Sequence, residues 1–585
     1  MTIFSVLQLL LGLSFFLYGM HVMSGNLEKI AGGRLETLLK KMTARPLAGL
    51  LLGVIVTLAI QSSSAVTVML VGLVNSGIMN FAQTIYIIFG ANIGTTLTAW
   101  ILSLSGIEGS NIWIQLLKPE HFSPLLAFLG ILLLMVSKSS RRRSIGSVLL
   151  GFAILMYGME FMKEAVSPLA EMPAFSNLMV QFANPLLGVL AGALITALIQ
   201  SSSASVGILQ ALSLTGGVTY SMAIPLVMGQ NIGTCITAII SCIGASANAR
   251  RVATVHLSIN VLGTAVCLAL YTGANAIFHF GFGSRPVSPV SIAVIHSLFN
   301  IAITVILLPF TKGLIRLSAL MVKDRKNTGA GNVPKLLDER LLFSPSVAVQ
   351  ACEGVTEKMG SIAEQTVREA IEVVRRYDKK VGAGIEEHEV ELDRLEDQLG
   401  SYLVKLSSKA LSTEDSRKIS RMLHAIGDFE RLGDHGVNLL KVSREMEEKK
   451  ISFSAEAAEE IDVLSAAIRE ILSLTMQAFR ENDVERAKNV EPLEQVIDRL
   501  TTTIRDHHIR RLQSGDCTIE MGFILSDLLT NFERISDHCS NLAVAVIEIA
   551  HNSFDTHKYL RGVKYGNAAF DRVYSRYAAQ FQLKK

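Results

Sequence analysis

The stretch Gln61-Ser62-Ser63-Ser64-Ala65 lies inside an apolar segment and recurs in a second apolar segment as Gln200-Ser201-Ser202-Ser203-Ala204. The same offset carries Asn92-Ile93-Gly94-Thr95 onto Asn231-Ile232-Gly233-Thr234, with no gap between the matched points. Chance does not produce such a register, so the chain contains an internal duplication, over residues of about 8–105 and 147–244. Duplicated apolar halves are typical of secondary transporters, whose substrate site lies where the repeats meet.

Charged residues are spread unevenly over the 585 residues of the chain. No aspartate precedes Asp324, whereas acidic and basic residues are frequent after it. The chain therefore divides near residue 325 into an apolar half and a charged half. The net charge of +3 is too small to suggest a nucleic-acid-binding protein, and the six cysteines show no zinc-ligand spacing.

The apolar half contains nine candidate membrane spans, since a span needs about 20 mainly apolar residues. Short loops rich in lysine and arginine stay in the cytoplasm, and the most basic one contains Lys138 and Arg141-Arg142-Arg143. Another basic cluster, within residues 312–326, follows the last span and leads into the charged half. We therefore expect a multi-pass protein of the cell (inner or plasma) membrane whose charged half is cytoplasmic. The expected spans are Ile3–Met23, Leu47–Val74, Phe81–Leu104, Leu125–Val136, Ile145–Met162, Leu186–Leu214, Ala223–Ile243, Val252–Ala276 and Val287–Phe310.

The Gln-Ser-Ser-Ser blocks are polar runs at membrane depth. A single serine in a membrane helix usually bonds to a carbonyl of its own helix, but such a run cannot direct every polar group to one buried face. Polar groups at this depth are costly unless they face the bundle interior or a water-filled path. We therefore predict that the paired blocks bind the transported solute. The Asn-Ile-Gly-Thr pair is a weaker signal, because asparagine and glycine could also form a turn between spans.

The segments around the two blocks are free of fixed positive charge, with no lysine or arginine in residues 46–117 or 165–249. A solute there meets hydroxyls, amides and backbone groups. Hydroxyls and helix N-termini donate to an oxyanion, while carbonyls and hydroxyl lone pairs suit sodium. An anion held without a fixed positive charge needs its charge offset, and a co-bound cation is the simplest solution, which favours symport.

Two further motifs place a histidine and an asparagine four residues apart on one helical face, His256 with Asn260 and His296 with Asn300. These four side chains could support ion binding or gating, or they could only form hydrogen bonds between helices. The sequence leaves both interpretations open.

The charged half has helical periodicity, with apolar residues three and four apart between charges. Its six segments suggest two three-helix units. A second duplication agrees with this, because Phe429-Glu430-Arg431 recurs as Phe532-Glu533-Arg534. The expected helices are Ser346–Arg376, Ile385–Ser407, Thr413–Glu447, Ala455–Arg480, Val484–Leu512 and Ile519–His551.

The apolar half resembles the type II sodium–phosphate cotransporter family, through the two serine blocks, Gly90-Ala-Asn-Ile-Gly-Thr-Thr96 and Gly229-Gln-Asn-Ile-Gly-Thr-Cys235. The resemblance implies inverted repeats with interrupted helices that share a site for phosphate and sodium. Cys235 stands where the first repeat has Thr96, so the two halves need not coordinate alike. The implied site residues are Gln61, Ser62, Ser63, Ser64, Asn92, Thr95, Thr96, Gln200, Ser201, Ser202, Ser203, Asn231 and Thr234.

The charged half is similar to the PhoU family of phosphate regulators, whose Glu-x-x-x-Asp motifs can hold metal ions. Each such pair shares one helical face. The alternative is a surface network bridged by arginine, which is the usual role of charged helical faces. The residues to which the resemblance assigns a divalent or iron-type metal are Glu389, Asp393, Glu430, Asp434, Glu494, Asp498, Glu533 and Asp537.

The expected protein is all-α, with a polytopic membrane domain at 1–315, a linker at 316–343, a PhoU-like domain of six helices at 344–551 and a basic tail at 552–585. We expect it to move inorganic phosphate with sodium across the bilayer under a cytoplasmic regulatory domain. The alternatives are a phosphate sensor that does not translocate, or a carrier of another oxyanion such as sulfate. No P-loop or nucleophile–base constellation suggests an enzyme. Association with a second copy or with a phosphate-signalling partner stays open.

Overall fold

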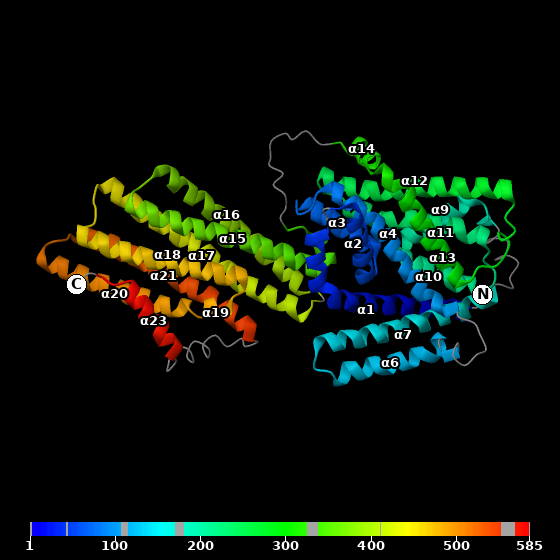
Figure 1. Ribbon diagram of the computed structural model, residues 1–585, viewed down its shortest axis with the longest axis horizontal. Helices are drawn as coiled ribbons and strands as arrows, with labels where there is room; N and C mark the ends of the chain where they lie inside the picture. The colour runs from blue at the N-terminus through cyan, green and yellow to red at the C-terminus, as the bar shows by residue number, and fades with distance from the viewer. Residues whose placement is uncertain are drawn as a thin grey trace. The chain divides into compact units, whose positions relative to one another are not determined.

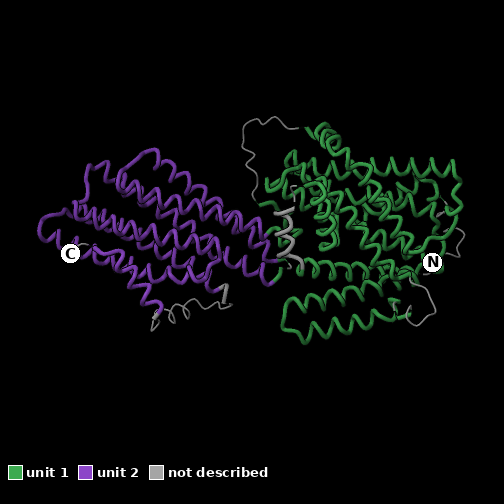
Figure 2. The backbone as a smooth tube through the Cα atoms, in the orientation of Figure 1, with its two compact units in different colours: residues 1–348, 409–412 green, residues 349–408, 413–585 purple. Residues whose placement is uncertain are grey.

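The computed structural model describes residues 3–42, 45–106, 115–116, 118–169, 181–323, 337–409, 411–551 and 568–583 (Figure 1). The described residues form helices joined by turns and loops, with one isolated β-bridge among them. The chain divides into two compact units, Met1–Ala348 with Lys409–Ser412, and Val349–Ser408 with Thr413–Lys585 (Figure 2). We call them the membrane unit and the helical unit.

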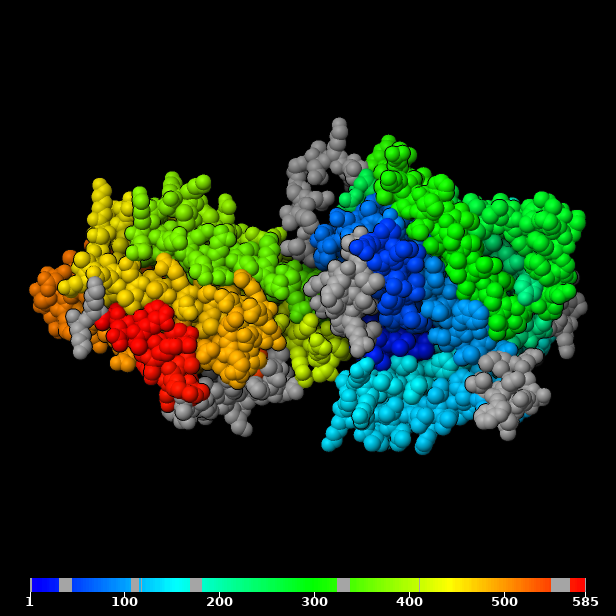
Figure 3. Space-filling view, in the orientation of Figure 1, coloured from blue at the N-terminus to red at the C-terminus, as the bar shows by residue number. Residues whose placement is uncertain are grey.

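Seven described helices of the membrane unit are long and apolar enough to cross a bilayer, so the chain is a multi-pass membrane protein. Large apolar side chains on their outer faces are exposed, as Phe128 and Met135 are on α6, which lies on the surface in Figure 3. All the described helices of the membrane unit, whether or not they are long enough to span a bilayer, are α1 (Ile3–Met42), α2 (Pro46–Ile60), α3 (Ser63–Asn75), α4 (Phe81–Ser103), α6 (Pro119–Val136), α7 (Ser140–Val166), α9 (Pro185–Ile199), α10 (Ser202–Ser213), α11 (Tyr220–Ser241), α12 (Ala247–Phe278), α13 (Pro289–Leu307) and α14 (Thr311–Met321), with short 3₁₀ turns η1 (Leu104–Gly106), η2 (Ser167–Leu169), η3 (Leu308–Phe310) and η4 (Glu339–Phe343).

Two of the nine expected spans are broken helices. The expected span Leu47–Val74 is the pair α2 and α3, which meet at an angle of 119°. The expected span Leu186–Leu214 is the pair α9 and α10, which is interrupted at the equivalent residue, Gln200. The interrupted helices expected from the family resemblance are therefore confirmed.

The repeats are inverted, as the contact between the equivalent helices α1 and α7 shows. A Cβ added to Gly12 would lie 2.9 Å from the Gly158 carbonyl oxygen, and one added to Gly19 would lie 2.5 Å from that of Gly151. An early residue of each helix thus meets a late residue of the other, so the two helices are antiparallel. Small residues permit this close approach in a membrane. Since α1 and α7 occupy the same place in the two repeats, the repeats run in opposite directions.

The glycines repeated in the Asn-Ile-Gly-Thr helices have a packing role. A Cβ on Gly90 in α4 would lie 1.9 Å from the Leu50 carbonyl oxygen of α2. A Cβ on the equivalent Gly229 in α11 would lie 2.0 Å from the Val189 carbonyl oxygen of α9. Both Asn-Ile-Gly-Thr segments lie within continuous helices, so the turn that was an alternative at the sequence level does not occur.

The region expected as a linker, 316–343, contains structured elements of the membrane unit. Part of α14 lies in it and packs on α12, and η4 packs on α3. Leu341 of η4 is fully buried, and a Cβ on Gly72 would lie 2.9 Å from it. This contact could not be predicted from composition, because η4 is too short to give a periodic apolar pattern. The Gly- and Asn-containing stretch of the expected linker lies outside the described residues.

The helical unit contains two three-helix groups that pack through α17 and α21, as expected. Gly360 of α15 contacts the Phe429 ring of α17, and α16 packs on the same helix. In the second group α18 and α20 both pack on α21. The helices are α15 (Pro345–Arg375), α16 (Lys379–Ser407), α17 (Thr413–Lys449), α18 (Ala455–Glu481), α19 (Val484–Ala487), α20 (Val490–Ser514), α21 (Ile519–His551) and α23 (Ala568–Gln580).

The helical unit departs from the expected boundaries in three places, the first being α16, which begins at Lys379 rather than at the expected Ile385. The expected helix Val484–Leu512 is divided into α19 and α20, because Pro492 has no N–H to donate and its ring excludes the carbonyl four residues earlier. The expected basic tail, 552–585, contains α23, which packs on α20. Residues 552–567 of that tail lie outside the described residues.

Candidate functional site

The serine blocks begin at a backbone break that is the same in both repeats. Gln61 has φ 58° and ψ 22°, and Gln200 has φ 58° and ψ 20°, which is the left-handed region that non-glycine residues rarely adopt. Their backbone N–H groups donate to the carbonyls of Thr57 and Thr196 at 2.6 and 2.7 Å. Each glutamine thereby ends one half-helix, and the next half-helix begins two residues later.

The first serine of each block caps the second half-helix. Ser62 Oγ accepts from the Ala65 backbone N–H, and Ser201 Oγ accepts from that of Ala204, both at 3.2 Å. The next two serines of each block lie in the first helical turn and are buried. Backbone N–H groups in that turn have no acceptor within the helix, so each break presents N–H and hydroxyl donors together. These second and third serines are Ser63, Ser64, Ser202 and Ser203.

Each serine half-helix contacts the Asn-Ile-Gly-Thr helices of both repeats. The half-helix α3 packs on α4 and α11, and the half-helix α10 packs on α11 and α4. The structure thus gathers the four predicted motifs in one region. Since residues 46–106 and 181–249 contain no lysine or arginine, its donors are neutral.

The asparagines of the Asn-Ile-Gly-Thr motifs bond to the two His–Asn motifs. Asn92 Nδ2 donates to Asn260 Oδ1 at 3.2 Å, and Asn231 Nδ2 donates to Asn300 Oδ1 at 2.8 Å. His296 Nε2 lies 3.2 Å from Asn231 Oδ1, and because that oxygen can only accept, Nε2 carries the proton. Hydrogen bonding between helices, one of the two open interpretations, therefore occurs.

The threonines of these motifs are satisfied within their own helices. Thr95 donates to the Ala91 carbonyl at 3.0 Å, and Thr234 donates to the Gln230 carbonyl at 2.9 Å. Thr96 likewise bonds within its helix, at 2.8 Å. Their hydroxyl protons are used, which leaves oxygen lone pairs for a cation.

Thr98 and Thr237, which are not among the residues predicted from the sequence, stand at equivalent places one turn after the Asn-Ile-Gly-Thr motifs. Thr98 Oγ1 donates to Gln61 Oε1 at 3.0 Å, so it touches a predicted site residue. The repeat register would have found them, because it maps one threonine onto the other.

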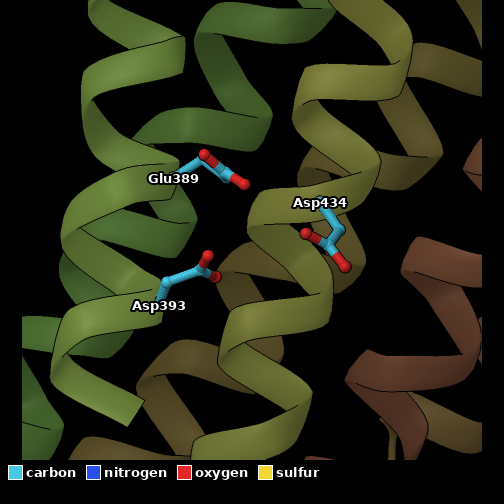
Figure 4. Close-up of side chains that lie close together, drawn as sticks. All are labelled: Glu389, Asp393 and Asp434. Atoms are coloured by element: carbon cyan, nitrogen blue, oxygen red, sulfur yellow. The ribbon is translucent and has the colours of Figure 1, made fainter. Parts of the chain in front are cut away.

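The helical unit brings together three of the four predicted carboxylates in each half. Oxygen atoms of Glu389, Asp393 and Asp434 lie within 4.8 Å of one another (Figure 4). The equivalent set in the second half is Glu494, Asp498 and Asp537. Neither Glu430 nor Glu533 belongs to these sets, although each lies on the same helix as the third carboxylate of its half.

Electrostatics around the first carboxylate set favour a cation. Burial, followed by the neighbouring Asp434 carboxylate, raises the pKa of Glu430 to about 7. Burial and the carboxylates of Asp393 and Asp434 raise the pKa of Glu389. Arg431 lies 3.0 Å from Asp434 and offsets part of this charge, so the arginine-bridged alternative is also partly realised. The donor set still fits a hard cation, which prefers carboxylate oxygens.

Comparison with known proteins gives a family for each unit. The Na+/Pi-cotransporter family matches residues 15–164 and 154–284, and the PhoU domain matches residues 356–442 and 461–546. The chain is 25% identical over 558 residues to YjbB of Escherichia coli, which is named as a candidate inorganic phosphate export protein, and the match covers 93% of this chain and 98% of that protein. It is 30% identical over 311 residues to the uncharacterized protein YqeW of Bacillus subtilis, covering 53% of this chain and 95% of that one. Among solved structures, PhoU from Pseudomonas aeruginosa is matched with 20% identity and a TM-score of 0.33, over 35% of this chain and 97% of that chain.

Proposed function

Because the chain belongs to the Na+/Pi-cotransporter family and carries two PhoU domains, we propose that it is a carrier that moves inorganic phosphate together with sodium across the membrane. The proposal assigns no chemical reaction to it. Phosphate transport is common to the family match and to the name of the relative YjbB, whereas sodium coupling is part of this proposal and the direction of transport is left to the experiment.

The observation that carries the proposal is the pair of equivalent breaks at Gln61 and Gln200. At each break the C-terminal end of one half-helix, which is negative, lies next to the N-terminal end of another, which is positive. Phosphate would be held by the N–H and hydroxyl donors of Ser63 and Ser202 and their neighbours. Sodium would be held by the carbonyls that end α2 and α9, together with the lone pairs of Thr95 and Thr234. A co-bound cation offsets the charge of the phosphate in a site without lysine or arginine.

The test is transport of labelled phosphate by the purified protein in liposomes. Uptake that requires an inward sodium gradient, and not one of potassium or protons, supports symport. Efflux from loaded vesicles is measured as well, because a relative is named for export. Binding without transport under any gradient would favour the sensor, and equal inhibition by sulfate would favour a general oxyanion carrier.

The site assignment is tested with Ser63→Ala and Ser202→Ala, each of which removes one buried hydroxyl. We expect both to reduce phosphate transport at least about tenfold, as loss of a hydrogen bond to a charged group would. Ser318→Ala is the matched control, because Ser318 is a buried serine of α14 whose hydroxyl, among the described residues, donates to the Ile315 carbonyl of its own helix. Normal phosphate transport by both site variants would contradict the assignment of the serine blocks to the binding site.

The helical unit is proposed to lie in the cytoplasm. Arg251 bonds to the Val322 carbonyl and Arg340 to that of Ser241, so basic residues collect at the end of the membrane unit from which the chain continues toward the helical unit. Basic ends stay cytoplasmic. Protease added outside intact cells should leave the helical unit uncleaved. Cleavage within the helical unit would show that it lies outside the cell and would contradict the proposed orientation.

The first carboxylate set is proposed to bind a divalent or iron-type cation. A calorimetric titration of Mn²⁺ into the full chain should detect metal binding. The variants Asp393→Asn and Asp434→Asn should each abolish binding at the first carboxylate set. The control is Glu485→Gln, which changes a carboxylate that is highly exposed and outside both sets. Unchanged binding in the two set variants would leave these residues as a surface network.

A further inference from the structure

We propose that the pairs Gln61–Thr98 and Gln200–Thr237 are alternating latches, of which one is closed in each end state of the carrier. The inference rests on the proposed function, since it assigns the latches to a transport cycle. The register of the duplication maps Gln61 onto Gln200 and Thr98 onto Thr237, so the two pairs have the same chemistry. A difference between them therefore does not arise from the residue types of the pairs themselves.

The first pair is closed. Thr98 Oγ1 donates to Gln61 Oε1 at 3.0 Å, and Gln61 Nε2 donates to the Leu58 carbonyl at 2.7 Å. Both side chains are buried, with Gln61 at 6% and Thr98 at 2% exposure. This bond ties the break of α2 and α3 to the later part of α4.

The second pair is open. Thr237 Oγ1 is buried and forms no hydrogen bond with any described residue. Gln200 is exposed, although its backbone angles match those of Gln61. A primary amide facing hydrocarbon is costly, so we expect the exposed Gln200 to face a water-filled path rather than lipid. The two breaks thus differ in access to water.

The two His–Asn motifs show a second asymmetry: the histidine bond is made to the second repeat, whereas the closed Gln–Thr pair lies in the first. His296 Nε2 bonds to Asn231 Oδ1 of α11, whereas both ring nitrogens of His256 are buried without a hydrogen bond to any described residue. The two Asn-Ile-Gly-Thr helices are therefore held by different contacts at one time. The structure corresponds to one end state of a two-state molecule.

The other end state follows from the duplication. In a carrier of inverted repeats, access alternates as the repeats move against each other. Since the two Gln–Thr pairs are chemically identical, an arrangement with the second pair closed and the first open has a similar local energy. Each latch then stabilises one end state only, and removing a latch shifts the population toward the other state.

The test measures access to the two breaks with cysteine reporters. Ile60→Cys and Ile199→Cys are placed one residue before Gln61 and Gln200, in a full chain whose six cysteines are replaced by serine and which retains phosphate transport. A membrane-impermeant thiol reagent is added from both sides of permeabilised vesicles. The rate of labelling then reports how often each break faces water. In the starting protein we expect the Ile199 position to react faster.

Thr98→Val and Thr237→Val each remove one hydroxyl at nearly constant volume. Thr98→Val should lower the ratio of labelling at position 199 to labelling at position 60 by about fivefold, the change that loss of one net hydrogen bond produces, and Thr237→Val should raise it. Serine at either position keeps the hydroxyl and should restore the starting ratio. Thr84→Val is the control, because Thr84 is a buried threonine of α4 that bonds to its own helix.

If Thr98→Val and Thr237→Val change the labelling ratio in the same direction, or if neither changes it, the latch proposal is wrong. The outcome is separate from that of the proposed function. Opposite shifts in a protein that binds phosphate but never transports it would keep the two-state switch and refute the carrier. Transport without opposite shifts would keep the carrier and refute the latches.

Discussion

Replacing Arg340 with alanine should release the η4 segment from the membrane unit. Arg340 donates from Nε to the Ser241 carbonyl at 2.5 Å, from Nη2 to the Ile243 carbonyl at 3.0 Å, and from Nη1 to Asp338 Oδ2 at 2.7 Å. Asp338 is only 4% exposed and also accepts from Asn75 Nδ2. One side chain therefore ties η4 to the end of α11, and its partner ties η4 to the end of α3.

The magnitude follows from these contacts. The Ser241 and Ile243 carbonyls lie at a helix end where water can replace the arginine, so their loss costs little. The larger cost is at the buried Asp338 carboxylate, which loses the Arg340 guanidinium but keeps the Asn75 amide and the backbone N–H of residue 340. Breaking a buried ion pair by removing one partner costs about 3–5 kcal/mol, and we take the lower end because Asn75 remains. About 3 kcal/mol corresponds to roughly a 150-fold rise in local opening.

Hydrogen exchange with mass spectrometry of the full chain in lipid nanodiscs measures this opening. We expect faster exchange in residues 337–348 and at the end of α11, with no change at the packed centre of α7. Arg340→Lys should give an intermediate effect, because one ammonium cannot reach all three acceptors. Arg316→Ala is the control, since that arginine is exposed on α14. A change below threefold in 337–348 would refute the docking of η4 as a stabilising contact.

Three further outcomes are expected from stability measurements on the full chain. Gly90→Ala should lower the thermal midpoint of the detergent-solubilised protein, because its Cβ would lie 1.9 Å from the Leu50 carbonyl oxygen and such overpacking lowers the free energy of unfolding by about 1–3 kcal/mol or more. The control is Gly25→Ala, whose Cβ meets nothing within 4 Å and which should be neutral or stabilising. Because folding raises the pKa of Glu430 to about 7, its contribution to stability is present below the unfolded value of 4.5 and is lost as pH rises through about 7; with a chelator present, Glu430→Gln should flatten the pH profile of urea unfolding by about 1–2 kcal/mol, after allowance for solvent screening. Phe429→Ala removes a fully buried ring of the helical unit and should cost about 3–5 kcal/mol by the same unfolding assay, and a cost below 1 kcal/mol would contradict the packing described.

Much of the membrane unit could be predicted from its sequence. Apolar length reveals spans, and an ungapped register reveals a duplication without any knowledge of contacts. The same register marked the serine blocks around Gln61 and Gln200 as equivalent. It did not indicate that these glutamines are left-handed, because that conformation depends on how α3 and α10 pack against their neighbours.

The outline of the helical unit could be predicted equally well, since its periodicity placed four of its six long helices to within two residues, and a fifth, α16, begins at Lys379 rather than at the expected Ile385. The division of the remaining one at α20 has a local cause, Pro492, that could have been read from the sequence. The grouping of Glu389 and Asp393 with Asp434 could not, because they lie on two helices whose relative rotation is set by packing.

Local properties follow from the amino-acid sequence without any knowledge of contacts: where helices form, where charge is absent, and which residues of one repeat correspond to those of the other. The tertiary structure alone decided the antiparallel docking of α1 on α7, the attachment of η4 through Arg340, and the unequal states of two identical Gln–Thr pairs. The physical reason is that helix formation depends on neighbours within a few residues. Docking and bistability depend on contacts between residues far apart in the chain, whose free energies appear only once the helices are packed.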